Sequence, residues 1–261
     1  DLTPPKITSI LGPNFLKHDQ TETQVTLLVN DANKVECKFS KEQGRPYETM
    51  DFQTLCTEDR PDQVFYYCYA SLTDLTQGEN KFYFKCKDKS EAQKENTQDF
   101  EYILKGSQQL QAIVVDPSPS GTIYNNAVTL AVSTLGGAES GKAQCYYQLL
   151  ENPLNFQQAQ PYLFVNTGET THTQSQGCPP DLQTCSPEQG LPQGNYKYDI
   201  TCNDAAENVA KTNIEFAVAS DTEQPRLLHV YKQSSSIFII LNEKTTCKYD
   251  SNQFEFGQGN L

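Results

Sequence analysis

The chain has 261 residues, enough for two domains of roughly 100–150 residues each. Its formal net charge of −13 at pH 7 repels phosphate backbones, which argues against a nucleic-acid partner. No apolar run approaches the ~20 residues that a membrane helix needs, so we expect no direct membrane insertion within this segment.

The N-terminal part of the chain predicts a series of short strands. An acidic, proline-containing stretch at residues 1–7 favours an extended entry into the first of them. Residues 25–29 alternate between apolar and polar, which is the period of a half-buried strand. A strand at 35–40 and a later strand at 82–87 each place one cysteine on the apolar face, so both cysteines are expected in a core.

The same pattern occurs again further along the chain. Residues 191–204 match residues 75–88, and extending this match without a gap places Phe100 on Phe216. Residues 128–132 repeat the alternating strand of the first copy. A repeat of fixed period indicates one folding unit that has been copied. About seven short strands in each copy, with turn signals between them, predict a β-sandwich.

A third copy begins at residue 221 and is incomplete. Its residues 237–241 alternate like the strands above. A piece with about three strands is too small to form a sandwich alone, so we expect either that the chain continues beyond Leu261 or that a neighbouring molecule completes the sheet. The predicted domains are residues 1–108, 109–220 and 221–261.

The nine cysteines predict a disulfide framework. They include no Cys-x-x-Cys spacing, so disulfides in an oxidising compartment are favoured over a metal site. Four cysteines in a complete copy allow three connectivities, and the repeat favours a nested pairing. The expected bonds are Cys37–Cys86, Cys56–Cys68, Cys145–Cys202 and Cys178–Cys185. Cys247 matches Cys37 and Cys145, and its partner is expected past the end of the chain.

Several short motifs accompany the strands. A Leu-x-x-Gly lead-in precedes the late strand at residues 75–78 and 191–194, and an Asp-Ala-Ala-Glu-Asn turn follows at 204–208. The strands that carry Cys37 and Cys247 read Cys-Lys-Phe-Ser and Cys-Lys-Tyr-Asp. Together these motifs resemble the immunoglobulin-like and fibronectin-type-III-like repeats of large prokaryotic surface proteins. The resemblance implies that each longer disulfide joins the third strand of a sandwich to the sixth.

We therefore predict an all-β fold of tandem immunoglobulin-like β-sandwiches with a partial third copy. The chain departs from related patterns at two points. It has no Trp, whereas antibody domains carry one in the core, and Glu207 stands where the turn of the surface repeats has glycine. These departures argue against an antibody or receptor domain and leave the sandwich prediction unchanged.

Nothing in the sequence predicts catalysis. A catalytic site needs a nucleophile, a base and an oxyanion site that converge, and no Gly-x-Ser-x-Gly motif is present. The three histidines, His18, His172 and His229, are far apart along the chain. We expect a segment that is not an enzyme, with no catalytic and no cofactor-binding residues.

Calcium is the one cofactor that the sequence leaves open. Asn and Asp at residues 30–33 and 204–208 offer oxygen ligands, and Asp1 and Asp221 lie at domain entrances. No EF-hand spacing is present, and turn formation explains the same residues. We therefore assign no metal ligands from the sequence.

The expected role is mechanical or adhesive. Tyr66, Tyr83 and Tyr146 are candidates for binding a glycan or a protein, on the interpretation that they face away from the cysteines. We predict a non-catalytic, extracellular structural or adhesive segment of an S-layer, sheath or filament protein on a cell surface. Self-association or contact with neighbouring surface proteins is expected. The alternative is a ligand-binding or accessory module of a secreted enzyme.

Overall fold

The computed structural model describes residues 3–57, 65–124, 127–156, 158, 160–175, 190–220, 225–234, 236–242 and 247. The chain divides into two units, Asp1–Ala219 and Ser220–Leu261. Within the described residues, regular structure consists of β-strands and two single-turn 3-10 helices, η1 (Tyr47–Thr49) and η2 (Glu139–Gly141). Neither helical turn in this part of the chain has the length and apolar character that crossing a membrane requires.

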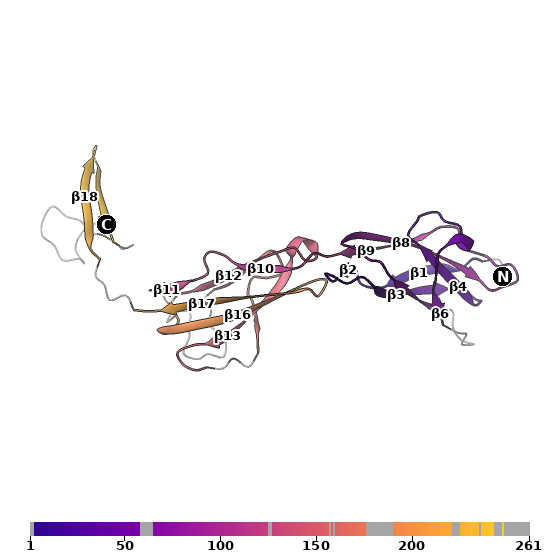
Figure 1. The fold of residues 1–261 in the computed structure, drawn as a ribbon, viewed down its shortest axis with the longest axis horizontal. Helices are drawn as coiled ribbons and strands as arrows, with labels where there is room; N and C mark the ends of the chain where they lie inside the picture. Colours follow the sequence, from indigo (N-terminus) through magenta and orange to yellow (C-terminus); the bar gives the residue numbers. More distant parts are fainter. Residues whose placement is uncertain are drawn as a thin grey trace. The chain divides into compact units, whose positions relative to one another are not determined.

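The first part of the larger unit is a sandwich of two sheets (Figure 1). One sheet has the order β1-β3-β7-β6, and the other has the order β2-β9-β8-β4-β5. Neighbouring strands are antiparallel except for β2 and β9, which are parallel. The strands are β1 (Lys6–Leu11), β2 (Phe15–Leu16), β3 (Thr23–Asn30), β4 (Val35–Ser40), β5 (Phe52–Gln53), β6 (Leu55–Cys56), β7 (Phe65–Leu72), β8 (Gly78–Asp88) and β9 (Phe100–Gly106).

Alternating side chains explain why these segments are strands. Val25, Leu27 and Val29 are buried along β3, and the residues between them are partly exposed. Phe39 on β4 and Phe84 on β8 fill the other side of the core, with their ring centroids 5.2 Å apart. Burying each of these side chains stabilises the sandwich by roughly 1.5–3 kcal/mol relative to leaving it exposed.

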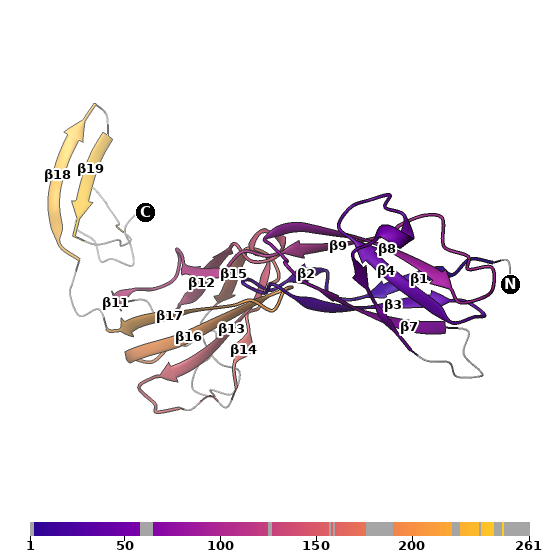
Figure 2. The same ribbon diagram turned by 45° about the vertical axis from the view of Figure 1, so that its right-hand side comes forward.

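The second sandwich repeats this plan (Figure 2). One sheet has the order β10-β12-β15, and the other has the order β11-β17-β16-β13-β14, in which β11 and β17 are parallel. The strands are β10 (Gln111–Val114), β11 (Gly121–Ile123), β12 (Thr129–Leu135), β13 (Ala143–Glu151), β14 (Tyr162–Leu163), β15 (Thr171–Ser175), β16 (Gly194–Asp204) and β17 (Val209–Val218).

The second sandwich has an aromatic core of its own. Tyr198 on β16 is fully buried, and the ring of Tyr147 packs edge-on against Phe164 at 5.6 Å. The core of the first sandwich runs from Ile7 to Leu104, and that of the second from Leu110 to Val218. The two cores share no residue, and the all-β fold class of tandem sandwiches is confirmed. The expected boundary at 108/109 falls between these two cores.

The register of the strands corrects one detail of the repeat. Asn80 on β8 pairs with Leu104, and its counterpart Tyr196 on β16 pairs with Phe216. Phe216 therefore matches Leu104, so the ungapped match to Phe100 is wrong. The reason is the turn after β8, which is longer than the turn after β16. Sequence identity before the turn carried no information about the length of the turn itself.

The glycine of the Leu-x-x-Gly lead-in has a structural cause. Gly78 and Gly194 begin β8 and β16 with φ values of 98° and 142°, a region that side chains disfavour. At Gly194 a Cβ atom would also stand 2.5 Å from the ring of Pro153. Both late strands thus start at a point where only glycine fits without strain.

The described residues of the C-terminal unit form a hairpin of β18 (Leu227–Gln233) and β19 (Ser236–Leu241), drawn in yellow in Figure 2. The two strands pair antiparallel, and the ring of Tyr231 stacks on Phe238 with centroids 5.2 Å apart. Ile237 is 69% exposed and Ile239 is 46% exposed. The expected burial of this strand is therefore wrong for the described residues, because a hairpin alone has no second layer to cover it.

Candidate functional site: the disulfide centres and the outer face of strand β7

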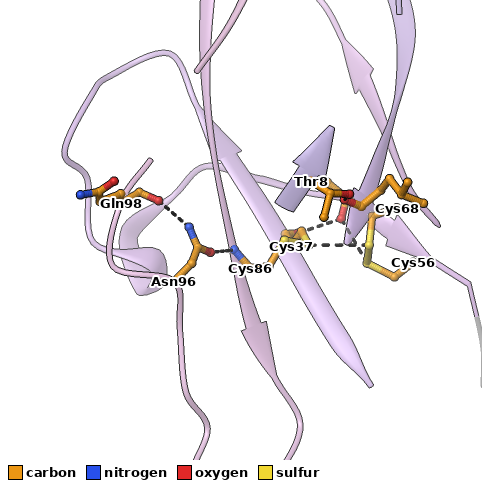
Figure 3. The surroundings of a disulfide bond; sticks show 9 residues. Thr8, Cys37, Cys56, Cys68, Cys86, Asn96 and Gln98 are labelled. Atoms are coloured by element: carbon orange, nitrogen blue, oxygen red, sulfur yellow. Dashed lines mark hydrogen bonds between the residues drawn. A yellow bond between two sulfur atoms is a disulfide. The ribbon is translucent and has the colours of Figure 1, made fainter. Parts of the chain in front are cut away.

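Two disulfides lie together in the core of the first sandwich. Cys37 on β4 stands directly opposite Cys86 on β8, and Cys56 on β6 stands opposite Cys68 on β7. Both pairs are bonded. The Sγ atoms of Cys37 and Cys68 are 3.6 Å apart, so the two bonds meet between the sheets (Figure 3). Each bond joins neighbouring strands of one sheet, and the contact between the bonds spans the two sheets.

The same sulfurs have the spacing of a metal cluster. The Sγ atoms of Cys37, Cys56 and Cys68 all lie within 4.8 Å of one another. A metal requires thiolates, and each of these sulfurs is engaged in a disulfide. The chemistry of the donors therefore does not fit a metal in the oxidised protein.

The second sandwich has the equivalent longer bond. Cys145 on β13 stands opposite Cys202 on β16, and the two are bonded. The backbone N–H of Cys145 donates to Thr167 Oγ1 at 2.8 Å, which holds the end of this strand. The expected Cys178–Cys185 bond lies outside the described residues. Cys247 is an exposed free cysteine.

The turn after β16 is organised by one buried carboxylate. Asp204 Oδ1 accepts hydrogen bonds from the backbone N–H groups of Ala206 and Asn208, each at 2.9 Å. Asp204 Oδ2 accepts from the N–H of Ala138 at 2.6 Å and from Asn208 Nδ2 at 2.8 Å. Glu207 adopts a φ of 61°, which explains why related turns have glycine there. Both oxygens of Asp204 are occupied by donors, so the Asp204 carboxylate is engaged in holding the turn.

Asn208 links this turn to the segment that precedes the second sandwich. Its Nδ2 donates to Ser107 Oγ at 2.8 Å, and its Oδ1 accepts from the backbone N–H of His18 at 2.7 Å. Ser107 in turn donates through its own N–H and hydroxyl to the carbonyl of Leu16. The Asn of the predicted turn therefore bonds to groups that belong to the first copy.

The three tyrosines singled out from the sequence do not form an exposed surface. Tyr66 is buried and points inward on β7, because it stands two residues before Cys68 and shares its face. Tyr83 is also buried, and its hydroxyl donates to Glu101 at 3.2 Å. Tyr146 is half-buried and donates to Gln144. The interpretation that placed Tyr66 on the outer face is wrong.

Three of the four outward side chains of β7 are aromatic, and the fourth is Ser71. Phe65, Tyr67 and Tyr69 are 41%, 38% and 40% exposed, and we name them the aromatic stripe. The alternation of β7 produces it, since Tyr66, Cys68 and Ala70 point into the core. In the sequence, counting by two from Cys68 gives the inward residues, and the aromatic residues that alternate with them are the stripe.

Neighbouring strands extend the aromatic stripe sideways. Leu55 on β6 stands opposite Tyr69 and is 76% exposed, and Leu28 on β3 stands opposite Tyr67. The Cys56–Cys68 disulfide lies directly behind, because Cys68 is the residue between the two tyrosines. Exposed aromatic and aliphatic side chains thus lie together on a strand that is covalently fastened to its edge neighbour.

His18 and His172, the two histidines of the larger unit, bond to different groups. His172 on β15 is fully buried between two hydroxyls, with Thr134 Oγ1 2.8 Å from Nε2 and Thr167 Oγ1 2.9 Å from Nδ1. His18 lies near the start of the chain and contacts Asp19 and Gln77. A hollow where β13 ends and β16 begins is lined by Leu150, Glu151, Asn152, Pro153, Asn155, Phe156, Gly194 and Asn195, and Glu151 is the titratable side chain in that lining.

His172 gives the second sandwich a defined sensitivity to acid. Burial lowers the pKa of His172 below its usual value of about 6.5. In the window below 6.5 the unfolded chain binds the proton and the folded chain does not, so stability falls as the pH is lowered through it. We expect His172→Gln to reduce this loss. Urea unfolding at pH 7.5 and 5.5, followed by hydrogen exchange of β12 and β15, measures it. An identical pH dependence in both proteins would contradict the assignment.

Comparisons with known proteins concern the fold. No family model matches the chain, and no curated protein matches its sequence. The fibronectin(III)-like modules of Clostridium thermocellum CbhA are 9% identical, with 86% of this chain and 100% of that chain covered and a TM-score of 0.44. The chicken CNTN1 FN1–FN3 domains are 10% identical, with 94% and 76% covered and a TM-score of 0.34. The immunoglobulin domains 1–5 of Sidekick-1 are 11% identical, with 87% and 41% covered and a TM-score of 0.38.

The sheets and disulfides of the chain define its structural class. Each of the two described sandwiches has two layers, a core of its own and a disulfide between paired strands. The chain is therefore a tandem array of disulfide-bonded immunoglobulin-like β-sandwich modules.

Proposed function

We propose that the chain is a non-catalytic, extracellular structural and adhesive segment of a prokaryotic surface, sheath or filament protein. In this role the sandwiches act as stable spacers, and the aromatic stripe of the first sandwich is the adhesive surface. Its partner is another copy of the chain, a neighbouring surface protein or a glycan. The disulfides favour an oxidising location outside the cytoplasm.

The observation that carries this proposal is the exposure of the aromatic stripe on a fastened strand. Aromatic residues are enriched at protein interfaces, and contiguous exposed apolar side chains mark interaction sites. Phe65, Tyr67 and Tyr69 project from β7. Its neighbour on one side is β3, which carries Leu28, and its neighbour on the other side is β6, which carries Leu55. A stripe that is already rigid loses little conformational entropy when it binds, which favours affinity.

Serine substitution of the three stripe residues tests the proposal. We expect the Phe65→Ser/Tyr67→Ser/Tyr69→Ser variant to lose self-association or glycan binding by at least ~10-fold, because hot spots at interfaces are mostly aromatic. Sedimentation velocity of the purified chain and a glycan array measure the two kinds of partner. Since the substituted side chains are solvent-exposed, the variant should keep the cooperative unfolding of the first sandwich.

A matched control removes exposed apolar surface elsewhere. Val209→Ser changes a residue that is 53% exposed on β17 of the second sandwich, and it should leave both kinds of binding intact. Two results would show that the aromatic stripe is not the adhesive surface. In one, the triple variant binds as the unmodified chain does; in the other, the unmodified chain neither associates nor binds a glycan. Binding to a polysaccharide alone would favour an accessory module of a secreted enzyme.

A further inference from the structure

Two buried carboxylates lie at one end of the first sandwich. Asp31 follows β3, and Asp88 is the last residue of β8. The N–H of Lys89 donates to the carbonyl of Lys34 at 2.7 Å, so the loop after β3 and the turn after β8 are in contact. Asp31 is 6% exposed and Asp88 is 2% exposed. Buried acidic side chains are rare unless a partner compensates their charge.

One oxygen of this pair has no hydrogen-bond partner. Asp88 Oδ1 accepts from the N–H of Ser90, from Ser90 Oγ and from the N–H of Lys94, at 3.1, 2.7 and 3.1 Å. Asp88 Oδ2 is buried and accepts no hydrogen bond. An ionised oxygen without a donor costs more than a neutral group in the same place. The lone pairs of Asp88 Oδ2 therefore accept no hydrogen bond in the interior of the first sandwich.

The two carboxylates also repel each other. Burial is the main cause that raises the pKa of Asp31, the N–H of Asn33 opposes the rise, and the negative charge of Asp88 adds to it. Among the described residues, no lysine or arginine forms an ion pair with either carboxylate. The arrangement lacks the positive charge that would stabilise it.

The second sandwich shows how the protein treats the same position when it supplies donors itself. Asp204 is the counterpart of Asp88, and its Oδ2 accepts from Ala138 and Asn208. Ala138 belongs to a loop between β12 and β13 that is longer than the loop between β3 and β4. In the first sandwich no donor reaches Asp88 Oδ2, and a second buried carboxylate, Asp31, lies in the loop that contacts the turn after β8.

We propose that the first sandwich binds one hard divalent cation, Ca²⁺ in preference to Mg²⁺, between the carboxylates of Asp31 and Asp88. Calcium takes six to eight oxygens in flexible geometry, and two anionic side chains, loop carbonyls and water supply that kind of set. Magnesium demands a near-ideal octahedron, which an irregular pair of loops does not provide. The cation neutralises both charges and fastens the loop after β3 to the turn after β8.

Calcium titration of the full chain tests the site. We expect calorimetry to show binding by CaCl2 and thermal unfolding to shift upward by several degrees relative to EDTA, since a ligand that binds only the folded state stabilises it. The titration extends to about 10 mM, an excess over the ~10⁻⁴–10⁻³ M dissociation constants of extracellular calcium modules. MgCl2 in place of CaCl2 should give weaker binding.

Neutral variants locate the ion. Asp31→Asn and Asp88→Asn should each weaken calcium binding by at least ~10-fold, since the charge of the ligands sets the affinity. Asp199→Asn is the matched control, because Asp199 is exposed on β16, and it should bind as the unmodified chain does. In EDTA, Asp31→Asn should melt at a higher temperature than the unmodified chain, because it removes the repulsion.

Two outcomes would overturn the proposal. One is the absence of both heat and a melting shift with CaCl2, which would mean that protonation of Asp31 relieves the repulsion instead. The other is unchanged calcium affinity in Asp31→Asn. Asp88 Oδ1 also holds its turn, so Asp31→Asn decides the test if the Asp88 variant does not fold.

Discussion

Replacing Cys145 and Cys202 with alanine is expected to lower the melting temperature of the second sandwich by on the order of 15 °C. The bond links residues separated by 57 positions, and in the chain-entropy description restricting such a loop contributes about 4 kcal/mol. Both cysteines are fully buried, so the substitution also removes packing from the core. Scanning calorimetry of the oxidised double variant measures the shift.

The shorter disulfide of the first sandwich is the comparison for this result. Cys56 and Cys68 are separated by 12 positions, so replacing both with alanine should cost about 3 kcal/mol and act on the first sandwich. If the Cys145/Cys202 variant melted like the unmodified chain, or if its effect fell on the first sandwich, the disulfide would not be what stabilises the second sandwich.

The second large effect is expected at Asp204. Asp204→Ala should destabilise the second sandwich by about 3–4 kcal/mol, because it leaves the buried N–H groups of Ala138, Ala206 and Asn208 without acceptors. Each unsatisfied donor costs roughly 1–3 kcal/mol, and relaxation and water entry keep the sum below the maximum. Urea unfolding measures the loss, and hydrogen exchange should quicken first at these three amides.

Asp199 again gives the matched change on the same strand. Asp199→Ala removes an exposed carboxylate from β16 and should alter the stability by no more than about 0.5 kcal/mol. Equal losses in the two variants would show that the charge, and not the hydrogen bonds of Asp204, stabilises the turn.

The repeat made much of the architecture predictable. A cysteine that alternates with apolar residues must point into the core, and two such cysteines at matching places in two copies leave a simple pairing. The same alternation predicts that Val25, Leu27 and Val29 are buried, as they are. What the alternation does not contain is which strands are neighbours, so it did not show that the sulfurs of Cys37 and Cys68 approach within 3.6 Å.

The errors have identifiable causes. Tyr66 has the same parity as Cys68, so the period of two itself placed it inside, and the interpretation of it as an outer tyrosine ignored that count. Phe216 was matched to Phe100 because turn length is independent of strand periodicity. Ile237 and Ile239 on β19 are exposed, because the alternation of a strand carries no information about whether a second layer covers it.

The proposed cation site was only half visible in the sequence. Asp31 belongs to an Asn-Asp-Ala-Asn segment that reads equally well as a turn or as a set of ligands. Asp88 stands two residues after Cys86, so its burial follows from the alternation of β8. Asp88 Oδ2 has no hydrogen-bond donor because the loop between β3 and β4 is short. That relation between a loop and a strand end exists only in the folded chain.

Disulfide mapping tests whether oxidised cysteine pairs join neighbouring strands within a sheet of each sandwich. The full chain is alkylated without reduction, digested and analysed by mass spectrometry. We expect linked peptides containing Cys37 with Cys86, Cys56 with Cys68, and Cys145 with Cys202. Alkylated thiols at these positions, or zinc bound to them in the intact protein, would contradict it.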